Sequence, residues 1–183
     1  MTEVIEKPVA NFVLDPVRHL RLIADLDHIA AVAGINPHYV RTSMVPYCDS
    51  TEVDYVVNFR LYRENHSGLL ICGKDDTEER CFAICGALVR NFIDARVMTL
   101  TTLLDAAEAH ATPDPTVLIV PNFYMCTYGK TLPAWKVATI YDILLSRAAE
   151  NRPTILGMDN YQTMKQSYGQ SITNHLKKYR GQP

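Results

Sequence analysis

The chain has 183 residues, of which 48% are apolar, with a formal net charge of −2 and a pI near 6.3. This length favours one domain that buries a sizeable core without disulfides, and the charge gives no overall reason to expect nucleic acid or membrane binding. The sequence lacks an apolar run of the roughly 18 residues that a membrane span needs, and its N-terminus is unlike a signal peptide. We therefore expect a cytoplasmic protein with no membrane partner.

The first 45 residues are predicted to form an arm and one helix that precede the main fold. Asp15-Pro16 is a good helix start, because Asp caps free amides and Pro fits the first turn. Apolar residues then recur at helical spacing as far as Ala33. Gly34 ends the helix, and Asn36-Pro37 marks the break.

Residues 46–183 alternate between short apolar runs and helical patterns. The sequence predicts strands at 68–73, 95–100, 116–121 and 153–158. It predicts helices at 51–64, 78–93, 103–109 and 133–149, and a polar one from the last strand to about 179. Alternation of this kind predicts an α/β fold, with a parallel sheet between layers of crossover helices.

Five pieces of this pattern carry a family resemblance, namely residues 33–39, 68–73, 96–105, 116–123 and 152–160. In this order and spacing they resemble the AAA+ P-loop core of bacterial replicative helicase loaders and transposition ATPase subunits, the DnaC and IstB-like group. The resemblance implies that the second piece precedes Walker A, that the fourth is the Walker B strand and that Asn160 is the sensor. The chain leaves no room for the fifth strand and helical lid that most AAA+ modules carry.

The loop at the Walker A place departs from what nucleotide binding needs. A P-loop needs glycines so that its backbone wraps the phosphates, a lysine that reaches them and a hydroxyl on magnesium. Aligned on Gly73, the two later glycine positions hold Asp76 and Glu78, the lysine position Glu79 and the hydroxyl position Arg80. The other residues of this vestigial nucleotide site are Lys74, which is misplaced, Thr77, Asn122 and Asn160.

The Walker B place is altered as well. Pro121-Asn122 stands where the family has acidic residues for magnesium and water activation, and neither residue serves as a general base. The sequence therefore predicts a pseudo-ATPase with no catalytic residues and no cofactor. It also predicts no metal site, since Cys81 and Cys85 form the only close cysteine pair and are better explained as buried thiols.

The resemblance implies an inactive helicase-loader-like protein of phage or mobile-element type. It would act as an adaptor, a loader or an inhibitor in DNA replication, and its partner would be a replicative helicase or a helicase loader. Leu20 and Ile23 on the N-terminal helix are candidate contact residues, and assembly of several copies stays open. A second candidate contact is the acidic surface of Asp75, Asp76, Glu78 and Glu79.

An alternative function is single-stranded DNA binding. Aromatic and lysine side chains interleave in the loop after the third strand, and such side chains stack bases and follow phosphates. The candidates there are Tyr124, Tyr128, Lys130, Trp135 and Lys136. Lys177, Lys178 and Arg180 form a second basic cluster, although cations at a helix C-terminus also stabilise its dipole. A third alternative is an atypical nucleotide-using enzyme.

Overall fold

The computed structural model describes residues 13–73, 76–125 and 132–182, and the four predicted strands are present in it. They are β1 (Leu69–Cys72), β2 (Ala95–Val97), β3 (Val117–Tyr124) and β4 (Thr154–Met158). All pair in parallel, in the order β1-β4-β3-β2. A helix connects each strand to the next, as parallel pairing requires.

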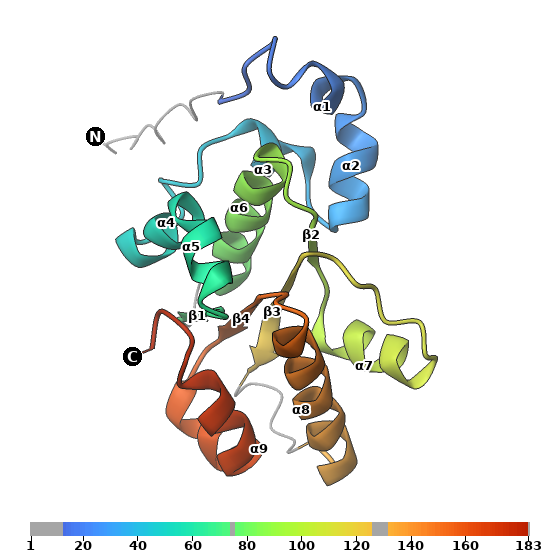
Figure 1. The fold of residues 1–183 in the computed structure, drawn as a ribbon, viewed down its shortest axis with the longest axis vertical. Helices are drawn as coiled ribbons and strands as arrows, with labels where there is room; N and C mark the ends of the chain where they lie inside the picture. Colours follow the sequence, from blue (N-terminus) through green and yellow to red (C-terminus); the bar gives the residue numbers. More distant parts are fainter. Residues whose placement is uncertain (1–12, 74–75, 126–131, 183) are drawn as a thin grey trace, which may run out of the picture.

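Helices cover both faces of the sheet, so the predicted three-layer architecture is confirmed (Figure 1). One side carries α1 (Leu20–Ala24), α2 (Leu26–Ala33), α3 (Pro37–Arg41), α4 (Ser50–Val57), α5 (Phe59–Glu64) and α6 (Thr77–Arg90). The other carries α7 (Leu100–Glu108), α8 (Ala134–Ala149) and α9 (Tyr161–Leu176). No helix in the described ranges is long and apolar enough to cross a membrane.

Strands β1, β3 and β4 are mostly apolar because both faces of the sheet are covered. Leu69 and Ile71 belong to the core under α2–α6, whereas Leu70, between them, belongs to the core under α7–α9. Successive side chains of a strand point to opposite faces, so each apolar run supplies both cores.

Two predicted helices are each broken into two. The helix from Pro16 to Ala33 is interrupted at Asp25, and that over 51–64 is interrupted at Asn58. Both residues leave helical geometry, with φ of −114° at Asp25 and −101° at Asn58. The apolar spacing survives each break, so periodicity alone could not reveal it. The short α3 was not expected.

The described part of the N-terminal segment packs on the main fold. Leu22, Leu26 and Ala30 share one buried core with Ile71 of β1 and Ile84 of α6. The boundary predicted near residue 45 therefore does not coincide with a break in the packing.

The end of the chain lies along the outer edge of β1. The Leu70 amide donates to the Arg180 carbonyl at 2.8 Å, and the Arg180 amide donates to the Gly68 carbonyl at 2.9 Å. The pairing stops at Gly181, whose φ of 75° turns the backbone. Within the described residues the sheet therefore has four strands, and Arg180 adds one isolated parallel bridge beside β1.

Candidate functional site

The loop between β1 and α6 lies at the carboxyl edge of the sheet, where α/β proteins usually bind ligands. Helix α6 begins at Thr77, with Asp76 as its N-cap. In the eight-residue P-loop pattern, four residues separate the first glycine from the glycine that precedes the lysine. Here the helix begins at the fifth position after alignment on Gly73, so the backbone turns into a helix where the pattern requires loop. Lys74 and Asp75 lie outside the described residues.

Thr77 ties the start of α6 to the end of β1. Its hydroxyl donates to the Gly73 carbonyl at 2.8 Å, and the residue is only 5% exposed. Its methyl group packs over Gly157 of β4, where an added Cβ would lie 2.6 Å from Thr77 Cγ2. The hydroxyl of this loop is therefore engaged by the protein itself.

Arg80 reaches back from α6 across the loop to α4. Its Nε donates to Glu52 Oε2 at 3.2 Å, and its Nη2 forms a close ion pair with the other oxygen of that carboxylate. Nη2 also lies 3.1 Å from Asp49 Oδ2, and Nη1 lies 3.6 Å from Asp76 Oδ1. Nη1 donates to the Cys72 carbonyl at 3.4 Å. The guanidinium thus joins the end of β1 to the starts of α4 and α6.

Glu52 is held in place independently of Arg80. Asp49 accepts the amides of Thr51 and Glu52, and Glu52 Oε2 accepts the Asp49 amide at 3.0 Å, which is a capping box. The Glu52 carboxylate is 2% exposed. Sequence reasoning missed both acidic residues, although the Asp49-x-x-Glu52 spacing is a recognised helix-start pattern.

Nearby carboxylates keep Arg80 ionised, and burial keeps the nearby thiols protonated. Burial acts to lower the pKa of Arg80, but the hydrogen bond and charge of Glu52 raise it above its ordinary value. Burial, followed by Glu52, raises the pKa of the Cys48 thiol. Burial likewise raises the pKa of Cys72 and of the fully buried Cys81. Neutral thiols are poor nucleophiles and poor metal ligands.

The side chains described around the loop are mostly acidic or already paired with acidic groups. A phosphate needs free N–H donors or positive charge, but the Arg80 guanidinium already faces carboxylates on three sides. Asp76, Glu78 and Glu79 are exposed around it and add negative charge. Like charges at such range repel an anionic ligand.

At the Walker B place, Asn122 has a structural role. The strand does not end at Pro121, as expected, but continues to Tyr124. Proline cannot donate to a strand ladder, and pairing with β4 resumes at Tyr124 after a register shift. Asn122 Oδ1 accepts the Leu100 amide at 2.8 Å, so this side chain anchors the start of α7.

At the sensor place, Asn160 caps α9. Its Oδ1 accepts the Thr163 amide at 2.9 Å, and the residue is exposed. The structure therefore places Asn160 at the carboxyl edge of the sheet, as the sequence predicts, and gives it a helix-capping contact.

The candidate DNA-contact residues fall into two groups at opposite ends of the sheet. Trp135, 53% exposed, lies at the start of α8, which leaves the carboxyl edge, and the Lys136 ammonium lies 5.2 Å from its ring centre. Lys177 and Lys178 are exposed beside the amino end of β1, and Arg180 there stacks 5.3 Å from the ring of Tyr62. The two basic clusters therefore do not form one continuous surface.

Tyr124 is packed rather than available for stacking. Its hydroxyl hydrogen-bonds Ser167 Oγ at 3.0 Å, and its ring meets that of Tyr168 edge-on. Tyr128 and Lys130 lie outside the described residues. Leu20 and Ile23, the candidate partner contacts, are 67% and 42% exposed on α1.

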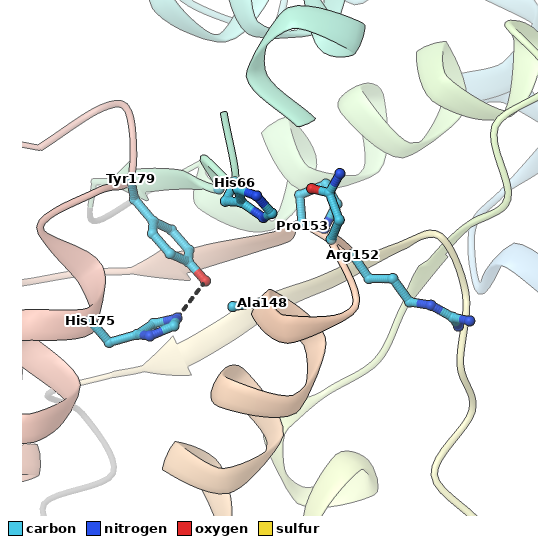
Figure 2. A pocket seen from close by; sticks show the side chains of 8 residues that line it. His66, Ala148, Arg152, Pro153, His175 and Tyr179 are labelled. Carbon is cyan, nitrogen blue, oxygen red and sulfur yellow. Dashed lines mark hydrogen bonds between the residues drawn. The ribbon is translucent and has the colours of Figure 1, made fainter. Parts of the chain in front are cut away.

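A small cavity lies at the amino end of the sheet, away from the loop (Figure 2). His66, His175 and Tyr179 line it, and the Arg152 side chain extends away from it. Its volume of about 10 Å³ is room for about one water molecule. It cannot hold a nucleotide.

The chain matches no protein-family model and no curated protein. Its structure is similar to the crystal structure of DnaI, with a TM-score of 0.52 at 13% sequence identity. The match covers 81% of this chain and 93% of that chain. At this identity the likeness concerns the fold alone. The chain therefore has an α/β fold that resembles that of DnaI.

Proposed function

We propose that this chain is a helicase-loader-like protein that acts without binding or hydrolysing ATP. It serves as an adaptor, loader or inhibitor of the replicative helicase machinery. The fold likeness to DnaI, a DnaC-family helicase loader, supports this class of function, and loaders of that kind work with replicative helicases.

The Arg80 contacts are the observation that carries the loss of ATP chemistry. A guanidinium bound to Glu52, Asp49 and Asp76 lies against the loop that a nucleotide would need. The start of α6 at Thr77 and the engaged Thr77 hydroxyl support the same proposal.

Two exposed surfaces are proposed for docking. The first is the α1 face with Leu20 and Ile23, because large apolar side chains in solvent favour a protein partner. The second is the exposed acidic pair Glu78 and Glu79, which would meet a basic surface. Asp76 is less suited, since it also contacts Arg80.

A pull-down with the host replicative helicase and its loader tests this function. The proposal predicts retention of one of them by the full chain, with or without ATP. Charge reversal at Glu78 and Glu79 serves as the matched variant for the acidic surface. If neither protein is retained, the proposed function loses its basis.

A second candidate is single-stranded DNA binding, favoured by the exposed Trp135–Lys136 pair. Trp135 is the only tryptophan of the chain, so its fluorescence reports directly on a stacked base. This candidate predicts quenching by an oligonucleotide, which weakens with salt, and loss of binding in Lys136→Ala. Fluorescence that is unchanged by DNA would exclude stacking on Trp135.

A further inference from the structure

The oxygen atoms around the Arg80 guanidinium form a cage drawn from three elements. Glu52 supplies both carboxylate oxygens, and Asp49 and Asp76 supply Oδ2 and Oδ1. The Cys72 carbonyl, at the end of β1, completes it. The Glu52 carboxylate is 2% exposed, so this cage holds an almost fully buried negative charge.

The cage matches the shape of a guanidinium. Nε and Nη2 bind the two oxygens of Glu52 side by side, which is the fork-to-fork geometry that arginine makes with carboxylates. Gly73 lies against the plane, where an added Cβ would be 3.2 Å from Arg80 Nη1. Among the described residues, no group of three or more His, Cys, Asp or Glu side chains is arranged to hold a metal ion.

The carboxylates hold their positions through contacts that do not involve Arg80. The capping box fixes Asp49 and Glu52 relative to each other and to α4. Removal of the Arg80 side chain would therefore leave a preformed anionic cavity rather than a collapsed one.

We infer that Asp49, Glu52, Asp76 and the Cys72 carbonyl form a guanidinium-binding site whose resident ligand is the chain's own Arg80. The site takes a planar, forked cation, and it ties the end of β1 to the starts of α4 and α6 without an external ligand. This goes beyond the proposed function, because it holds whether or not the chain binds a helicase.

Chemical rescue of Arg80→Ala tests the inference. The melting temperature of this variant is measured against guanidinium chloride at concentrations below those that denature. When the guanidinium concentration is ten times its Kd for the emptied site, the melting temperature of Arg80→Ala is expected to rise by about 3 °C. The wild-type chain, whose site is filled, is expected to show only a small decrease.

Three controls separate site binding from general effects. Sodium chloride at equal ionic strength and urea at equal concentration are expected to give no rescue, because neither is a forked cation. Arg80→Ala combined with Glu52→Gln is expected to lose the rescue. Arg60→Ala removes an exposed arginine and is expected to behave as wild type.

The outcomes are decisive in either direction. If guanidinium lowers the melting temperature of Arg80→Ala as much as that of the wild type, the inference is overturned. Equal rescue of the double variant would overturn it as well. If Arg80→Ala is unfolded in buffer, far-UV circular dichroism follows the same titration. The helical signal then returns with guanidinium if the site exists, and its failure to return also overturns the inference.

Discussion

Arginine is suited to the position of residue 80 because its planar guanidinium presents five N–H donors in a fixed fork. Nε and Nη2 serve Glu52, while Nη1 serves Asp76 and the Cys72 carbonyl. A lysine would keep the charge but could not reach these acceptors in one plane. The residue identity, and not only the charge, explains how one side chain connects β1, α4 and α6.

His175 gives the stability of the fold a dependence on pH. It is 7% exposed near the end of α9, with Tyr141 and Tyr179 against its ring and Lys178 close by. Burial, and then the charge of Lys178, lower its pKa below 6.5. Below pH 6.5 the unfolded chain takes up a proton that folded His175 resists. Stability is therefore full above pH 6.5 and falls as the pH drops through the folded pKa.

Urea unfolding at about pH 7 and about pH 5 checks this prediction. We expect a smaller free energy of unfolding for the wild type at the lower pH, and a smaller difference for His175→Gln. Equal losses in the two proteins would show that other groups cause the acid sensitivity.

At the residue scale, the sequence predicted that Asn160 lies at the carboxyl edge of the sheet. It did not predict that Arg80 pairs with Glu52 beside the β1–α6 loop. Asn160 follows an apolar strand directly, and the edge of a parallel sheet collects such residues. Arg80 and Glu52 are 28 positions apart, and no periodic pattern links them. Their pairing depends on how α4 packs beside β1, which only the folded chain reveals.

Among the elements, β4 is closely packed around its glycine, Gly157. A Cβ at Gly157 would lie 2.3 Å from the Pro121 carbonyl and 2.6 Å from Thr77 Cγ2. Since β4 lies between β1 and β3, a shift there disturbs both neighbours. We expect Gly157→Ala to lower the free energy of unfolding by about 3 kcal/mol or more.

Gly169→Ala is the control for this prediction. A Cβ there meets nothing within 4 Å, so only its φ of 80° opposes the change. We expect a loss of about 1–2 kcal/mol in denaturant unfolding. A Gly157→Ala protein as stable as wild type would contradict the packing of β4.

At the element scale, the strands were easier to predict than the helix ends. Each strand is a short apolar run between polar turns, and all four lie within the predicted ranges except the end of β3. That end was missed because Pro121-Asn122 has the composition of a turn. The breaks at Asp25 and Asn58 were missed because the apolar residues keep their spacing across them.

For the whole molecule, α1 has one leucine in the core and another in solvent. Variants of the two therefore distinguish an effect on folding from an effect on docking. Leu22 is 4% exposed and faces the core, whereas Leu20 is 67% exposed. We expect Leu22→Ala to cost about 3 kcal/mol of stability and Leu20→Ser less than about 0.5 kcal/mol. If α1 is the docking face, Leu20→Ser loses helicase retention in a pull-down while its melting temperature stays near wild type. Unchanged retention would remove α1 from the proposal.

The fold of the whole molecule could be predicted because five segments recur in a known order. The state of its loop could not, because that state depends on contacts between segments far apart in sequence. The most direct measurement is isothermal titration calorimetry of ATP with magnesium into the wild-type chain, alongside a competent P-loop ATPase as positive control. The account predicts no binding heat, since the Arg80 guanidinium beside the loop is already paired with three carboxylates. A saturating isotherm with a low-micromolar Kd would contradict it.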